Sequence, residues 1–209
     1  MDDYPLDEYD LCTICRESLP NFDAAYSFGS YEGALRKLIH LFKYAKVESL
    51  AQPLSQFLLR ALPLHQSFDL VIAMPMHWRK RWERGFNQAE LLAQPVARRF
   101  GLQLSTNLRR TRYAKPQASL TEAQRRQNMK DALAVRNRQQ VVGKRILLVD
   151  DVLTTGATLR AAAEVLKNAG AGHVFALTLA RVDRREFSAD VYQSRKEELQ
   201  PIFAGVTAD

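Results

Sequence analysis

Two adjacent acids and a hydroxyl-rich turn lie within the segment from Ile146 to Leu159, which reads ILLVDDVLTTGATL. Carboxylates such as those of Asp150 and Asp151 can accept hydrogen bonds from a pair of vicinal hydroxyls. Unpaired N–H groups and the dipole at a helix start favour anions, so the turn after the acids suits a phosphate monoester. Together the acids and the turn suit a 5-phosphorylated ribose. The turn residues are Thr154, Thr155, Gly156, Ala157 and Thr158.

The residues around the acids and the turn predict a strand before them and a helix after them. Ile146 to Val149 form an aliphatic run without polar alternation, which is typical of a strand buried on both faces of a parallel sheet. Leu159 to Lys167 are amphipathic and are followed by Asn168 and Gly170, which predicts a helix. The acids would then lie at the carboxyl end of a strand, where open α/β sheets bind ligands.

Four hydrophobic residues, two acids, two apolar residues and Thr-Thr-Gly-x-Thr resemble the motif by which type I phosphoribosyltransferases bind 5-phosphoribosyl 1-diphosphate (PRPP). The resemblance implies that Asp150 and Asp151 hold the ribose hydroxyls with help from hydrated Mg²⁺. It also implies that the threonine turn holds the 5-phosphate. The fold expected is an open, mainly parallel twisted sheet flanked by helices.

A second stretch with chemical potential follows the apolar run Asp69 to Ala73, another candidate strand. Residues 74–88 contain clustered cations and two tryptophans, and an amphipathic helix is expected from Ala89 to Phe100. We expect a loop that faces the same crevice as the acid pair. Trp78 and Trp82 could stack bases, or they could equally anchor the loop in the core.

This stretch and the two cysteines narrow the resemblance. A Pro-x-His loop at Pro75 to His77, the arginine cluster, Arg-Gly-Phe-Asn-Gln at residues 84–88 and a CxxC pair are similar to the ComF/GntX branch of phosphoribosyltransferase-like proteins. The resemblance makes the loop the pyrophosphate loop. Its candidates for binding the diphosphate are Arg79, Arg81 and Arg84.

Cys12 and Cys15 have the spacing of one zinc knuckle, but a zinc site needs four ligands. Members of the branch usually carry two such pairs, and this sequence has one. We interpret the pair as the remnant of a zinc ribbon and expect zinc below one ion per chain, although two chains could share one.

The remaining elements are expected to surround the site. We expect a small hood made of a strand at Ala25 to Ser30 and helices at Tyr31 to Tyr44 and Ser49 to Leu62. Lys43 and Lys46 of this hood could reach a phosphate, but we expect them to face solvent. Ser105 to Asn128 predict a long loop and then a short helix, resembling the family's flexible loop that orders over PRPP. Its candidate residues are Lys115, Gln117 and Arg125, with Arg110 and Thr111 before them. Two further strands are expected at Ala132 to Val135 and His173 to Leu179, with His173 structural.

Composition fits one main domain of an ordinary globular protein, with 209 residues, 46% hydrophobic and 25% charged. We expect a zinc-ribbon remnant at 1–24, the phosphoribosyltransferase-like domain at 25–181 and an unassigned tail at 182–209. No apolar run approaches the length of a membrane span, the acidic start is unlike a secretory signal, and two cysteines fit a reducing compartment, so we expect a cytoplasmic protein.

Positive charge is concentrated in the middle of the chain. Residues 76–145 carry 17 Lys and Arg against 4 Asp and Glu, whereas the flanking parts are net acidic. This centre attracts polyphosphate or nucleic acid, or it is simply a solvated surface.

Two functions follow as hypotheses. The first is a phosphoribosyltransferase of the ComF type with PRPP and Mg²⁺, an unknown acceptor and a link to DNA uptake. The second is a non-enzymatic module that binds single-stranded DNA, with PRPP as a regulator. A homodimer is considered in either case.

Overall fold

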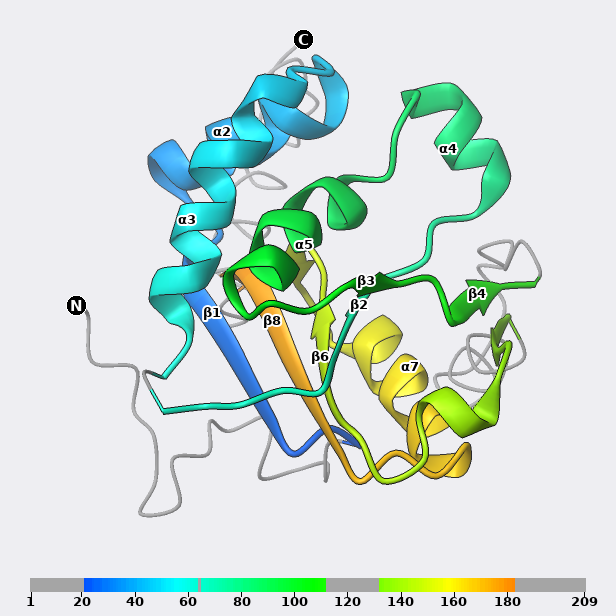
Figure 1. The fold of residues 1–209 in the computed structure, drawn as a ribbon. Helices are drawn as coiled ribbons and strands as arrows, with labels where there is room; N and C mark the ends of the chain where they lie inside the picture. Colours follow the sequence, from blue (N-terminus) through cyan, green and yellow to red (C-terminus); the bar gives the residue numbers. More distant parts are fainter. Residues whose placement is uncertain (1–20, 64, 112–131, 183–209) are drawn as a thin grey trace, which may run out of the picture.

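A parallel sheet forms the centre of the computed structural model, which describes residues 21–63, 65–111 and 132–182. The strands follow the order β1-β8-β6-β2-β3, and β7 pairs with β8 (Figure 1). All pairings of this sheet among the described residues are parallel. The α/β fold with an open parallel sheet is therefore confirmed. The strands are β1 (Ala24–Ser30), β2 (Leu70–Ala73), β3 (Leu104–Ser105), β6 (Arg145–Val149), β7 (Val152–Leu153) and β8 (His173–Arg181).

Helices cover both faces of the sheet. Helices α3 and α5 pack against each other on one face, and α7 covers the other (Figure 1). This sandwich explains the aliphatic runs, because β6 is buried from Ile146 to Val149 and β8 from Val174 to Ala180. Within the described ranges, no helix has both the length and the apolar character needed to cross a membrane. The helices are α2 (Gly33–Tyr44), α3 (Ala51–Ala61), α4 (Trp78–Arg84), α5 (Gln88–Arg99) and α7 (Ala157–Asn168), with 3-10 turns η1 (Glu48–Leu50) and η2 (Arg138–Gln140).

The chain reverses its direction of travel across the sheet between β2 and β6. From β2 it crosses through α5 to β3 at one edge, whereas from β6 it crosses through α7 to β8 on the opposite side. Strands β2 and β6 are direct neighbours, with Ala73 beside Val149. A crevice at the carboxyl ends of two such strands is where open α/β sheets bind ligands.

Helix α2 is the part of the expected hood that lies near these carboxyl ends. Ile39 and Phe42 are its fully buried residues, and the ring of Phe42 lies 5.6 Å from that of Phe86, just before α5. Helix α3, the other helix assigned to the hood, instead packs on the sheet face against β1 and β8.

Several short elements differ from the sequence-based expectation, among them the two-residue strands β3 and β7, which were not predicted. Residues 74–88, predicted as a loop, contain α4, a helix of 7 residues that begins after His77 and ends at Gly85. The predicted loop from Ser105 begins with β4 (Leu108–Arg110), which pairs in an antiparallel ladder with β5 (Leu133–Val135). Helix α4 and strands β4 and β5 are too short to show a periodic apolar pattern in the sequence. Tertiary contacts rather than local sequence signals stabilise them. The strand expected at 132–135 is confirmed.

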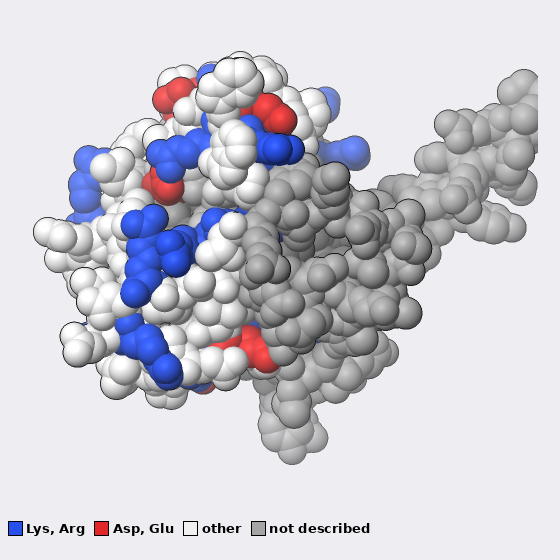
Figure 2. Space-filling view, turned by 90° about the vertical axis from the view of Figure 1, so that its right-hand side faces the viewer, with Lys and Arg blue, Asp and Glu red and all other residues white. Residues whose placement is uncertain are grey.

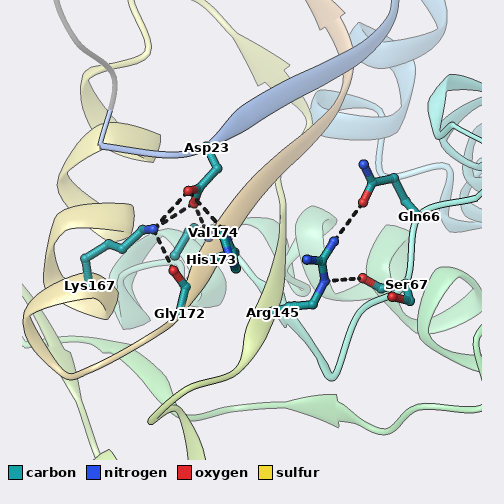
Figure 3. A network of polar contacts seen from close by, with 8 residues as sticks. All are labelled: Asp23, Gln66, Ser67, Arg145, Lys167, Gly172, His173 and Val174. Carbon is teal, nitrogen blue, oxygen red and sulfur yellow. Dashed lines mark hydrogen bonds and ion pairs between the residues drawn. The ribbon is translucent and has the colours of Figure 1, made fainter.

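His173 is structural, as expected, and belongs to a polar network at the start of β8 (Figure 3). The Asp23 carboxylate accepts hydrogen bonds from Val174 N at 2.6 Å, from Lys167 Nζ at 3.1 Å and from the His173 ring at 3.2 Å. Partial burial raises the pKa of Asp23, but these three hydrogen bonds outweigh it and hold the pKa below its ordinary value. Asp23 therefore ties the residues before β1 to α7 and β8.

Candidate active site

Asp150 and Asp151 lie directly after β6, at the carboxyl end of the neighbouring strands β2 and β6. The backbone N–H of Asp150 donates to Leu177 O at 3.0 Å, and the backbone oxygen of Asp151 accepts from Leu179 N at 3.0 Å. The Asp150 side chain accepts the Asp151 N–H at 2.9 Å. Strand β8 thus holds the backbone of both acids, and their positions at a strand end agree with the prediction.

Asp150 is electrostatically unusual. Burial and the neighbouring Asp151 carboxylate raise the pKa of Asp150 to about 7, while the Asp151 N–H and the charges of Lys43 and Arg110 act in the opposite direction. A carboxyl group with this pKa can exchange a proton at neutral pH, or it can accept hydrogen bonds from hydroxyls once it is ionised.

Asp151 forms an ion pair with a residue far away in the sequence. Its Oδ1 lies 2.8 Å from the Lys43 ammonium in the last turn of α2, and the two side chains are only 14% and 15% exposed. We expected Lys43 on a solvated face, and this expectation is wrong. The apolar spacing of α2 did not indicate the contact, because Lys43 directly follows the buried Phe42 and its partner lies 108 residues later in the sequence.

Further cations surround the acid pair. Burial and the charges of Arg84, Arg110 and Lys43 lower the pKa of Lys80, against an opposing effect of Glu83. The pKa of His77 is also lowered, first by burial and then by Arg110, Arg79 and Lys80. Cations from α2, α4 and β4 are therefore close enough to influence one another beside the acids. On the side of the molecule that carries α4 and β4, Lys and Arg form several clusters with few acids between them (Figure 2).

The three arginines predicted for a diphosphate take different positions. Arg84 lies over the Tyr44 ring at 5.3 Å and donates to Gln88 Oε1 at 3.2 Å, so α2 and α5 both hold it. Arg81 instead pairs with Glu90 of α5 at 3.1 Å, and Arg79 lies 5.3 Å from the ring of Trp78. Of the three, Arg84 is the one whose charge lowers the pKa of Lys80. A diphosphate role for any of the three stays a prediction.

Residues 84–88 organise the start of α5, a role that we did not predict from the sequence. Asn87 caps the helix by accepting from Ala89 N at 3.1 Å, and its amide donates to Met74 O at 3.1 Å. His77 caps α4 in the same manner, with Nδ1 accepting from Arg79 N at 3.2 Å. An Asn before an amphipathic helix is a recognisable capping signal, whereas a His cap is not.

The threonine turn leads into α7 as predicted. Gly156 has φ +72°, and a side chain there would lie 3.3 Å from Leu153 Cδ1. Thr154 and Thr155 are exposed, the Thr155 hydroxyl accepts from Ala157 N at 3.3 Å, and the Arg160 guanidinium donates to the Thr155 carbonyl. The turn therefore presents hydroxyls at a helix start, and a 5-phosphate role for it stays a prediction.

Several predicted site residues lie outside the described ranges. These are the flexible-loop candidates and the cysteine pair. Among the described residues, no group of three or more His, Cys, Asp or Glu side chains could hold a metal ion. The residues outside are Lys115, Gln117, Arg125, Cys12 and Cys15.

A separate open hollow of about 720 Å³ lies between α3 and α5. Its cations Arg60, Arg98 and Arg99 lie in the last turns of the two helices, where positive charge offsets the helix dipole. The hollow does not include the acid pair, so it is not the candidate active site.

Comparison with known proteins identifies the family. A model described as phosphoribosyl transferase domain matches residues 87–207, a range that includes Asp150, Asp151 and the threonine turn. The chain belongs to this family. The DNA utilization protein YhgH of Escherichia coli O157:H7 is 34% identical over 178 residues, which cover 81% of this chain and 77% of that protein. Competence protein F of Haemophilus influenzae is 30% identical over 178 residues, with 81% and 78% covered. These relatives confirm a phosphoribosyltransferase-like protein of the ComF type.

Solved structures of phosphoribosyltransferases are more distant. Adenine phosphoribosyltransferase from Thermoanaerobacter pseudethanolicus is 22% identical, with a TM-score of 0.41 over 65% of this chain and 83% of that chain. Glutamine PRPP amidotransferase from B. subtilis is 24% identical, with a TM-score of 0.45 over 62% of this chain. The match covers 26% of the amidotransferase, so the present chain spans about a quarter of its length.

Proposed function

We propose that the protein binds PRPP and transfers its phosphoribosyl group to an acceptor, with release of diphosphate, in a process linked to DNA uptake. The observation that carries the proposal is the position of Asp150 and Asp151. They lie at the carboxyl end of the neighbouring strands β2 and β6, with the threonine turn after them and cations of α4 and β4 nearby. The names of the relatives, DNA utilization protein and competence protein, support the link to DNA.

Each group of residues has a role in this proposal. Asp150 and Asp151 accept hydrogen bonds from the ribose hydroxyls, and residues 154–158 bind the 5-phosphate. Lys80 and Arg84 face the diphosphate, with Arg79 and Arg81 available to it, and Lys115, Gln117 and Arg125 close over the ligand. Such catalysis is electrostatic, because the oxocarbenium-like centre and the leaving diphosphate need fixed charges rather than a protein nucleophile.

Mg²⁺ enters this proposal as a partner of the PRPP diphosphate. The described part of the chain offers two adjacent carboxylates and no three-residue metal cluster, and one carboxylate already holds Lys43. These residues do not fit a divalent ion held by the protein alone. When bound with PRPP, Mg²⁺ would neutralise charge on the leaving diphosphate. Zinc at Cys12 and Cys15 is proposed to be substoichiometric, which metal analysis after dialysis would test.

Calorimetric titration with PRPP and Mg²⁺ tests binding, and release of pyrophosphate with candidate acceptors tests catalysis. The proposal requires PRPP to bind more tightly than ribose 5-phosphate, because the cations of α4 and β4 have no diphosphate to contact in the smaller ligand. Equal affinity for the two ligands would remove the diphosphate role of these cations.

A second candidate function is binding of single-stranded DNA through α4. Trp78 and Trp82 are 66% and 86% exposed, so neither anchors the segment in the core. Trp78 and Trp82 are four residues apart and therefore lie on the same face of α4. The three residues between them in the sequence are the cations Arg79, Lys80 and Arg81. Exposed aromatic rings beside cations suit stacked bases and a phosphate backbone. Replacing both tryptophans by Ala should weaken single-strand binding by about tenfold or more while leaving PRPP affinity unchanged.

A further inference from the structure

The Lys43–Asp151 ion pair is a fixed part of the protein rather than a chance surface contact. The two atoms, Nζ and Oδ1, are 2.8 Å apart, and both side chains are largely shielded from water. Helix α2 is held in place by its buried residues Ile39 and Phe42, the latter against Phe86. The ammonium therefore reaches the acid pair from an anchored helix, and a shielded ion pair is little weakened by salt.

An acid pair at a strand end would otherwise suit a hard divalent cation, which prefers carboxylate oxygens. In this chain the pair already has partners. Oδ1 of Asp151 holds Lys43, and Oδ1 of Asp150 accepts the Asp151 N–H. A divalent ion would have to displace or repel the ammonium before it could bind Asp151.

We propose that Lys43 is the resident cation of the acid pair and takes the position at Asp151 that a divalent metal would otherwise take. Without PRPP, the chain then has little affinity for Mg²⁺ or Mn²⁺, because the positive charge is built into α2. If the proposed function holds, the ribose hydroxyls meet an acid pair whose charge is already partly balanced, and metal is needed only by the diphosphate. Lys43 is thus a positioning residue, whose ammonium group supplies the positive charge at Asp151 in place of a bound metal ion.

The alternative is that Lys43 only ties α2 to the sheet. A tether and a resident cation both predict a loss of stability when Lys43 is replaced. They differ in metal binding, because only a resident cation leaves an acid pair that attracts a divalent ion when it is removed.

The test measures binding of Mn²⁺ alone to the full chain, without PRPP, by the electron paramagnetic resonance signal of free Mn²⁺. We expect Lys43→Gln to bind one Mn²⁺ about tenfold or more tightly than the wild type, since a repelling charge next to a carboxylate has been removed. Lys37→Gln is the matched control, because Lys37 is an exposed lysine of the same helix. It should leave Mn²⁺ binding at the wild-type level.

The gain must also depend on the acid pair. In Lys43→Gln combined with Asp151→Asn, Mn²⁺ affinity should return to the wild-type level. A folded Lys43→Gln protein with unchanged Mn²⁺ affinity would overturn the proposal and leave Lys43 as a tether. So would a gain that survives Asp151→Asn. If the Gln variant does not fold, Lys43→Met retains an unbranched side chain that can pack in place of the lysine stem and makes the same test.

The result is separable from the proposed function. Failure of the wild type to bind PRPP would overturn the phosphoribosyl proposal, but the Mn²⁺ measurements would still decide the role of Lys43. Conversely, PRPP binding with unchanged Mn²⁺ affinity in Lys43→Gln would retain the proposed function and remove the resident cation.

Discussion

The Asp150 side chain is held near a neighbouring carboxylate and away from most of the solvent, and these two conditions give it a pKa of about 7. Protonation in the empty protein and ionisation in the complex are then both accessible at neutral pH. Asp151 differs because Lys43 balances its charge at 2.8 Å. The two adjacent aspartates therefore have different electrostatic environments, because only Asp151 forms an ion pair with a lysine.

Replacing Asp150 by Asn should change thermal stability in a manner that depends on pH. Because the pKa of Asp150 is raised on folding, its contribution to stability is complete below about pH 4 and is lost as the pH rises through about 7. The Asn variant avoids this loss. Its advantage over the wild type should be near zero at pH 4 and reach about 4 kcal/mol above pH 7, because the pKa rises from 3.8 to about 7 at roughly 1.4 kcal/mol per pH unit, and this corresponds to roughly 8 to 16 °C in Tm. Thermal unfolding across this range measures it, and a difference that is constant with pH would contradict the raised pKa.

The acid pair as a whole should control PRPP affinity. Asp150→Asn or Asp151→Asn removes a charge-assisted hydrogen bond worth roughly 1.5 to 3 kcal/mol, or about 10- to 150-fold in affinity. The double variant should show no measurable binding by calorimetry. Its unfolding curve serves as the control for an intact fold. Affinity within about threefold of the wild type would reduce the motif to an ordinary strand, turn and helix.

At the scale of elements, the segment β6-turn-α7 could be predicted almost completely from sequence. The aliphatic run, the two acids, the glycine and the amphipathic helix each carry a local signal, and these signals agree. Helix α4 and the pair β4-β5 could not be predicted in this way. A seven-residue helix rich in Arg and Trp has no apolar stripe, and β4 and β5 are three residues each, with pairing partners more than twenty residues away.

Gly156→Ala should damage both stability and the phosphate turn. The residue has φ +72°, and a new Cβ would lie 3.3 Å from Leu153, so we expect a loss of about 1 to 2 kcal/mol. PRPP affinity should fall as the turn shifts. Gly143→Ala is the matched control, because its φ is +69° but a Cβ there has no neighbour within 4 Å. Gly143→Ala should lose a similar amount of stability but keep the PRPP affinity of the wild type. Equal PRPP affinities in the two variants would show that the turn at residues 154–158 does not bind the ligand.

For the whole molecule, the sequence shows which part of the chain carries the positive charge, but not which charges lie next to each other in the fold. Counting residues located the positive charge in the middle of the chain, and clusters of Lys and Arg are visible on the side of the molecule that carries α4 and β4 (Figure 2). Counting could not show that Lys43, from the acidic first third of the chain, reaches Asp151 in the last third. Such a pairing follows from the topology of the sheet, which brings α2 over the carboxyl end of β6.

Binding of single-stranded DNA should depend on salt through α4. If about four phosphates are engaged, the slope of log K against log salt should be near −3. Charge reversal at Arg79 and Arg81 should make this slope clearly shallower. Arg98→Glu with Arg99→Glu changes the net charge equally but lies at the end of α5, by the hollow near α3. If both double variants flatten the slope equally, the effect reflects net charge and not a site on α4.

The pairing of β1 with β8 has a consequence for synthesis of the protein. Ala24 lies beside Phe175, so among the described strands the first in the chain pairs with the last. About 150 residues must be translated between them, which takes roughly 8 to 30 seconds at common ribosomal rates. During this time β8, the strand with which β1 pairs in the described sheet, has not been translated, and the core that β1 joins is incomplete. The emerging chain is therefore expected to need protection from aggregation until translation has passed β8, and to acquire its stable fold late.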